Sequence, residues 1–94
     1  MSVYIIAQIN IHDRETYNKY EAGFDEIYIR HKGFVNSVDE DPEILEGEWP
    51  FTRTVLLSFR SKEQAMGWFE SPEYQELAKI RRAASTANIV MVKR

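Results

Sequence analysis

Arg81 has the residue type and the position to bind an anion. In the segment PEYQELAKIRR it follows Leu77 by four residues and Tyr74 by seven, so at about 100° per residue the three side chains share one helix face. Three interpretations stay open for it. The guanidinium reaches water at the edge of the face, it pairs with a loop carboxylate such as Glu46 or Glu48, or it offers its planar donors to a carboxylate ligand.

Other residues of suitable chemistry lie at the ends of the predicted elements. His31 ends the apolar stripe of the first helix, where an imidazole either caps the helix or acts as an acid or base. Trp49 lies in a loop, where a large aromatic residue covers either a pocket or a dimer interface. The candidate catalytic residues are therefore His31 and Arg81, and the candidate ligand-binding residues are Trp49, Arg53, Tyr74 and Arg81.

The sequence predicts neither a metal site nor a cofactor. The acidic run Asp39, Asp41 and Glu43 lacks the Gly and the Glu at the positions that a calcium-binding loop requires. Two distant His residues without any Cys do not make a transition-metal site. The sequence contains no Gly-rich phosphate loop and no nucleophile elbow. No motif therefore identifies a reaction.

Length and composition predict one domain, residues 1–94, in the cytoplasm. The 94 residues are 44% hydrophobic and 13% aromatic, which is typical of a globular chain, and the net charge is −3. This charge argues against binding to nucleic acid or to anionic lipid. The first residues lack a basic leader, and no segment has the roughly 20 apolar residues of a membrane span.

The hydrophobic pattern predicts four strands and two helical regions in the order β-α-β-β-α-β. Residues 3–11 alternate as a strand, and Asp13 then caps a helix whose apolar stripe includes Tyr17 and Tyr20 and whose end is marked by Gly33. Two more strands cover residues 34–38 and 52–59. A helical region follows, capped at Ser61 and again at Ser71, and residues 87–92 form the last strand. This order is that of a ferredoxin-like α+β fold with a four-stranded antiparallel sheet.

The strands also predict a homodimer. Right-handed crossovers place both helical regions on one face of the sheet. Three strands nevertheless carry apolar residues on both faces, for example Tyr4 and Ile6 beside Val3 and Ile5. Because the sequence offers no third layer, a second copy of the chain is the expected cover, sheet against sheet.

The segments EGEW, RTVLLSF and SKEQAMGWFESPEYQELAKIRR resemble the family called domain of unknown function 1330, and the similarity extends over nearly the whole chain. That family is similar to the dimeric α+β barrel superfamily, which implies ferredoxin-like protomers that pair their sheets. Superfamily relatives include monooxygenases, isomerases, haem-degrading enzymes and stress proteins, so the resemblance implies no single activity. This chain differs from such families at Ser58, where Glu is common, and at Asp39, Glu40 and Asp41, which replace a Gly pair.

Two functional hypotheses remain. The first is a site for a small organic anion between the sheet and the helices, in an enzyme or in a binding protein. The second is a structural or regulatory dimer without chemistry, which predicts no enclosed cavity and an Arg81 held by Glu46 or Glu48. RNA binding on the sheet is disfavoured, because the central strand offers only Phe59 as an aromatic platform.

Overall fold

The computed structural model describes residues 2–94, which form seven elements. In chain order these are β1 (Val3–Ile11), α1 (Arg14–Arg30), β2 (Phe34–Asp39), β3 (Arg53–Phe59), α2 (Lys62–Phe69), α3 (Pro72–Ala84) and β4 (Ser85–Lys93). Asp13, Ser61 and Ser71 cap the three helices as the sequence predicts, each accepting a hydrogen bond from a backbone N–H three residues later.

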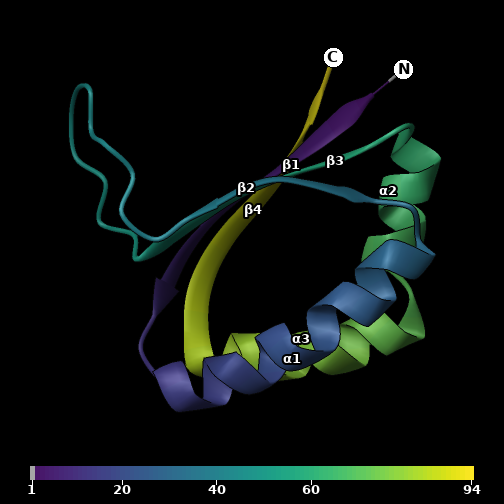
Figure 1. The fold of residues 1–94 in the computed structure, drawn as a ribbon, viewed down its shortest axis with the longest axis horizontal. Coiled ribbons are helices and arrows are strands. Elements are labelled where there is room, and N and C mark those ends of the chain that lie inside the picture. The colour runs from purple at the N-terminus through teal and green to yellow at the C-terminus, as the bar shows by residue number, and fades with distance from the viewer. Residues whose placement is uncertain (1) are drawn as a thin grey trace.

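The four strands form one antiparallel sheet in the order β2-β3-β1-β4. All three helices lie on the same side of this curved sheet, with α1 and α3 along its length and α2 at one end (Figure 1). The helix-facing residues of β1 are Val3, Ile5, Ala7 and Ile9, and all four are buried. The predicted ferredoxin-like fold is therefore confirmed, and the inner face of its sheet makes up half of the core.

Two strands differ in detail from the prediction. β4 begins at Ser85, directly after α3, because the pairing with β1 extends back to Ile11 and Ser85. β2 pairs with β3 through a register shift between Val35 and Ser37, a bulge that lets two valines of β2, Val35 and Val38, both face the helices. Neither feature follows from the alternation of apolar residues.

The end of α1 shows why the sequence has Gly33. The prediction gave Gly33 the usual role of a helix-ending glycine, and this reason is wrong, because the residue in the left-handed region is Lys32, at φ 61°. Gly33 is needed for a close approach: a Cβ at this position would overlap the ring of Tyr28. That ring crosses the backbone so that its hydroxyl can donate to the carbonyls of Phe34 (2.9 Å) and Ser58 (3.2 Å).

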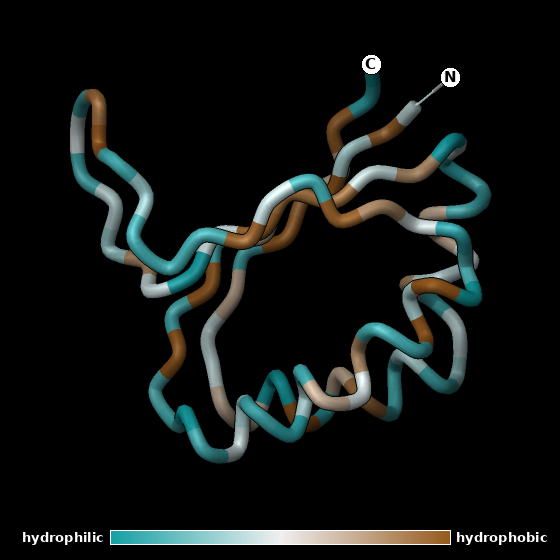
Figure 2. Tube along the Cα trace, viewed as in Figure 1, coloured by the Kyte–Doolittle hydropathy of each residue, from teal (hydrophilic) through white to brown (hydrophobic). Residues whose placement is uncertain are grey.

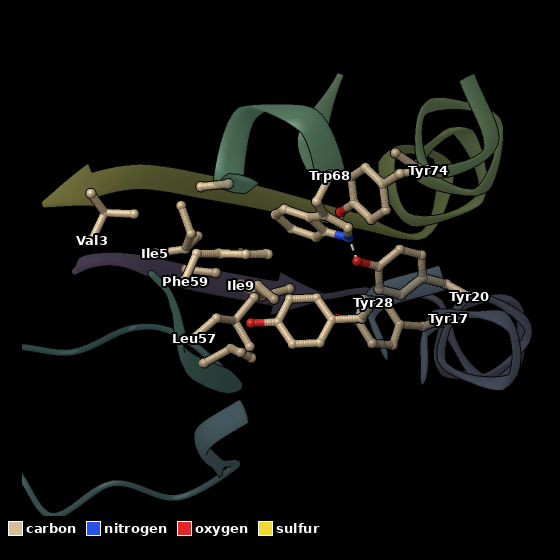
Figure 3. Packing of buried hydrophobic residues seen from close by; sticks show 14 of the residues in the cluster. Val3, Ile5, Ile9, Tyr17, Tyr20, Tyr28, Leu57, Phe59, Trp68 and Tyr74 are labelled. Carbon is tan, nitrogen blue, oxygen red and sulfur yellow. Dashed lines mark hydrogen bonds between the residues drawn. The ribbon is translucent and has the colours of Figure 1, made fainter. Parts of the chain in front are cut away.

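An aromatic cluster joins the helices to the sheet (Figure 3). Trp68 of α2 lies at its centre, with ring centroids 4.4 Å from Tyr74, 5.4 Å from Tyr28 and 5.5 Å from Phe59. Only 2% of its surface is exposed, as expected of a core residue. Since these rings come from α1, α2, α3 and β3, the cluster fixes each helix against the sheet.

The outer face of the sheet has no helix over it. Val90 and Val92 of β4 are 53% and 43% exposed, and Phe34 of β2 is 64% exposed. Tyr4, Ile6 and Leu56 on the strands between them are half-buried. Figure 2 shows hydrophobic residues along the strands above the helices. The exposed and half-buried residues just named show that the apolar character of the sheet is not confined to its covered side. Within residues 2–94, no helix is long and apolar enough to cross a membrane.

We predict that Gly33→Ala destabilises the fold by about 1–3 kcal/mol, the usual range for overpacking. The added methyl group displaces the Tyr28 ring and weakens its two hydrogen bonds. The measurement is urea unfolding followed by circular dichroism. Gly67→Ala is the matched control, because a Cβ there meets nothing within 4 Å and alanine favours the α2 helix, so its stability should rise by up to about 1 kcal/mol. Equal effects of the two substitutions would contradict this explanation of Gly33.

Candidate functional site

A cavity of about 170 Å³ lies between the helix-facing side of the sheet and the helices. Its floor is the inner face of β1 and β3, and its walls come from α1, α2 and α3. The lining includes aromatic side chains and four charged residues, Glu21, Asp25, Arg53 and Arg81. Three of the sequence-predicted site residues, Arg53, Tyr74 and Arg81, therefore meet around one space.

Arg81 is a buried residue of α3, with 5% of its surface exposed. The buried face of α3 consists of Tyr74, Ala78, Arg81 and Ala84, while Leu77 is only half-buried beside Gly23 of α1. This corrects the expected stripe and places Arg81 within the face rather than at its edge. Across residues 2–94, no carboxylate lies within ion-pair distance of Arg81, so the predicted pairing with Glu46 or Glu48 is wrong. Both glutamates are exposed in the loop between β2 and β3, which extends away from the sheet (Figure 1).

Aromatic rings provide the immediate surroundings of this charge. The guanidinium carbon of Arg81 lies 5.9 Å from the centroid of the Tyr20 ring, a cation–π arrangement. Burial opposes the charged form of Arg81, but the phenols of Tyr74 and Tyr20 outweigh it and raise the pKa of the guanidinium. Arg81 therefore remains a cation inside the fold.

Two phenols meet at the same end of the cavity. The hydroxyls of Tyr20 and Tyr74 are 2.8 Å apart, and Figure 3 shows them converging from α1 and α3. Burial, followed by the influence of Tyr74, raises the pKa of the Tyr20 phenol well above its usual value, so this hydroxyl is neutral at pH 7. One hydroxyl hydrogen of the pair lies between the two oxygens, and both rings line the cavity.

The positive charge of Arg53, unlike that of Arg81, is compensated by neighbouring carboxylates. Its guanidinium lies 3.1 Å from Glu40 and 3.5 Å from Glu21, and Arg14 lies 2.7 Å from Glu40 and 3.5 Å from Glu21. These four residues form a closed ring of alternating charges, which we call the charge ring. It joins α1 to β3 and to the residue after β2. Because two carboxylates already hold Arg53, the charge available to a ligand is that of Arg81.

Several buried polar atoms beside the cavity lack a hydrogen-bond partner. Among the described residues there are five such atoms, and four belong to residues that line the cavity: Glu21 Oε1, Arg53 Nε, Trp68 Nε1 and Arg81 Nε. Buried polar atoms are normally satisfied, and clusters of exceptions concentrate where a bound group or water is missing. Three of these four atoms are hydrogen-bond donors, so a group bound in the cavity would have to offer acceptor atoms.

The structure does not bring His31 or Trp49 to the cavity. His31 caps α1 and its Nε2 lies 2.9 Å from Glu73 of α3, while Arg30 lies 3.2 Å from the same carboxylate. The hydrogen bond from His31 is the main reason that the pKa of Glu73 is lowered. Trp49 donates its indole N–H to Thr54 (2.9 Å), a residue on the outer face of β3. Trp49 thus lies beside the uncovered side of the sheet.

Sequence reasoning missed some residues of the site. Tyr20 was assigned to the core by its place in the apolar stripe of α1, and it is both core and cavity wall. Glu21 was not predicted, although it follows Tyr17 by about one helical turn and therefore lies on the same side of α1. In the structure the ring of Tyr17 lies 5.6 Å from the guanidinium carbon of Arg53. Among residues 2–94, no three His, Asp or Glu side chains are grouped so as to hold a metal ion.

We predict that Glu40→Gln lowers stability at pH 7 by up to about 1 kcal/mol, the range for partly exposed ion pairs. Arg14, followed by Arg53, lowers the pKa of Glu40 below its ordinary value of 4.5. A lowered pKa in the folded state means that the carboxylate stabilises the protein above pH 4.5 and loses this contribution as the pH falls through the lowered value. The difference between variant and wild type should therefore shrink below pH 4.5 in urea unfolding measured across that range. Glu76→Gln, which removes an exposed pair with Lys79, is the control and should have a smaller effect. A variant as stable as the wild type at pH 7 would show that the charge ring contributes nothing.

Comparisons with known proteins agree with this fold. A model of the family described as "Domain of unknown function (DUF1330)" matches residues 2–94. No curated protein matches the chain significantly.

Solved structures share the architecture at low sequence identity. A protein of unknown function from Rhodopseudomonas palustris has a TM-score of 0.84 at 16% identity, over 99% of this chain and 82% of that one. A dimeric ferredoxin-like protein of unknown function from Jannaschia sp. CCS1 has a TM-score of 0.76 at 10% identity, over 100% of both chains. SnoaB, a cofactor-independent oxygenase from Streptomyces nogalater, has a TM-score of 0.71 at 14% identity, over 99% of this chain and 92% of that one. At these identities the similarity shows the fold and no activity.

Proposed function

This chain belongs to the DUF1330 family, whose description names no activity, and we propose that it binds a small organic anion in the cavity beneath its sheet. The observation that carries the proposal is the burial of Arg81, 5% exposed, without a carboxylate partner. A cation–π contact contributes about 0.5–2 kcal/mol, so the guanidinium can still gain from an anion placed close to it. An anionic ligand in the cavity would supply the missing partner.

The surroundings of Arg81 favour an anion with an organic body. The walls of the cavity are apolar and aromatic apart from a few polar groups, which is the usual composition of a small-molecule site. The Tyr20–Tyr74 hydroxyl pair adds a second polar group beside the guanidinium. The hypothesis of a dimer without chemistry predicted an Arg81 held by Glu46 or Glu48, and no such ion pair occurs within residues 2–94.

We predict that Arg81→Gln abolishes the stabilisation of the protein by small organic acids. Thermal unfolding is followed with and without a panel of carboxylates at millimolar concentration, for the wild type and for the variant. The wild type should gain in Tm with at least one acid, because a ligand that binds only the folded state raises its stability. Arg82→Gln is the matched control, since Arg82 is the exposed neighbour on the same helix. Equal shifts for wild type and Arg81→Gln, or none with any acid, would reject the proposal.

We also propose that two copies of the chain pair through the outer faces of their sheets. Val90, Val92 and Phe34 are exposed there, and Trp49 lies at the same face through its bond to Thr54. A patch of large apolar residues on a sheet face is a common mark of an interface. The similar proteins from Jannaschia sp. CCS1, Thermobifida fusca and Bacteroides fragilis are described as dimeric, which supports the same assembly here.

We predict that Val90→Lys weakens this dimer at least about tenfold, because a symmetric interface would bury the introduced charge twice. Size-exclusion chromatography with light scattering, over a dilution series, measures the dissociation. Ile29→Lys is the matched control: Ile29 is 70% exposed but lies on α1, away from the sheet face, so this variant should remain dimeric. A wild-type monomer, or a Val90→Lys dimer of unchanged affinity, would contradict the assembly.

A further inference from the structure

The size of the cavity restricts the ligand to about one ring. Its volume is about 170 Å³. Apolar protein cavities of about 150 Å³ bind benzene, whereas sites for drug-sized molecules have volumes of about 300–1,000 Å³. A carboxylate group and one six-membered ring fill the available space, and a second fused ring does not fit.

The walls favour a flat ring over a branched chain. Five aromatic residues line the cavity: Tyr17, Tyr20, Phe24, Trp68 and Tyr74. Their rings are tilted or edge-on to one another, with centroids 4.4–6.3 Å apart for the pairs in contact. Opposite them, the floor is formed by the aliphatic residues Ile5, Ala7, Ile9, Val55 and Leu57. An aromatic ligand between a ring-rich wall and a smooth aliphatic floor gains stacking and edge contacts as well as burial.

Some of the polar groups that line the cavity contact one another. Arg81, the Tyr20–Tyr74 hydroxyl pair and Trp68, whose Nε1 has no partner, belong to one contact group: Arg81 lies over Tyr20, and the Trp68 ring packs on Tyr74. This set consists of donors, one of them charged. A carboxylate has two oxygens with two lone pairs each, so it can accept hydrogen bonds from more of these donors than a single alkoxide or carbonyl oxygen can.

The exposed part of the lining shows how a ligand would be oriented. Asp25 of α1 is exposed, and Val35 and Val38 of β2 are 41% and 45% exposed, so the cavity opens between α1 and the edge strand. A carboxylate on Asp25 repels an anion at this opening. The acid group therefore lies inside at Arg81, and the ring lies between Arg81 and the two valines.

Resting on the proposed function, we infer that the ligand is a monocyclic aromatic carboxylate, bound with its carboxylate at Arg81 and the tyrosine pair and its ring against the aliphatic floor. Three features are thereby specified: one ring, an anionic head group and entry past β2. Separate experiments test the first two features.

The test is isothermal titration calorimetry of the full chain with sodium benzoate, sodium acetate, sodium 2-naphthoate and benzamide. Benzoate should bind at least about tenfold more tightly than acetate, which lacks the ring, and than 2-naphthoate, which is too large. Benzamide keeps the ring without the charge and should bind at least about tenfold more weakly than benzoate. Naphthoate binding as tight as that of benzoate would overturn the size limit, and benzamide binding as tight would overturn the carboxylate.

Variants separate this inference from the broader proposal. Ala7→Val adds two carbons to the floor and should weaken benzoate at least about tenfold while acetate is unaffected. Tyr20→Phe should weaken benzoate about three- to tenfold, because it removes the hydroxyl pair and leaves the ring under Arg81. If no acid of any size binds, the proposed function itself fails. If acids bind the wild type without a preference for a single ring, and bind Ala7→Val as tightly as the wild type, the proposed function stands and this inference is wrong.

Discussion

A buried cation without a buried anion is the constraint on which the rest of the site depends. Arg81 lies on the inner face of α3 with its guanidinium over the Tyr20 ring. Burial favours the neutral form of most bases, but a guanidinium does not lose its proton in proteins, so the fold must accommodate the charge. The ring quadrupoles and hydroxyl dipoles of the neighbouring tyrosines stabilise part of this charge. The positive potential that remains attracts an anion, and in this respect the cavity beside Arg81 differs from an ordinary packing defect.

A helix cap, aromatic packing and ion pairs hold the groups around Arg81 in place. Ser71 caps α3 by accepting from the backbone N–H of Tyr74 (3.2 Å), with Pro72 at the first helical position, and this fixes where the Arg81 face points. Trp68, one turn before that cap, packs on Tyr74 from α2. The charge ring then holds α1 against β3. The cavity is therefore enclosed by elements that are each fixed independently of any ligand, a requirement for a preorganised site.

The sequence was sufficient to predict the fold and part of the site. A physical difference separates the features that could be predicted from those that could not. Alternation and capping residues are local signals, so the strands, the caps and the single-sided helix layer were all predicted correctly. Arg81 and Tyr74 were proposed from residue type and helical spacing, and Arg53 from its place at the end of a strand, and all three line one cavity. His31 was proposed by the same reasoning but lies outside it. Whether a residue at the end of a stripe faces the interior depends on how two helices cross, and no pattern within one helix encodes that angle. The bulge in β2 and the overlap of Tyr28 with Gly33 were not predictable either, because each arises from a contact between separate elements.

The cavity itself argues that this arrangement is maintained for binding. A cavity of about 170 Å³ leaves the apolar and aromatic side chains that line it without packing partners, which costs stability. Domains of this size are stable by about 5–15 kcal/mol in total. A larger side chain at Ala7, which lines the cavity, would recover part of that energy with a small change in sequence, and Arg81 could be replaced by an apolar residue of similar volume. A chain that keeps Ala7 on the floor and a charge on the wall gives up stability in both places at once. Both losses are offset together only when a molecule with an apolar body and an anionic group occupies the space.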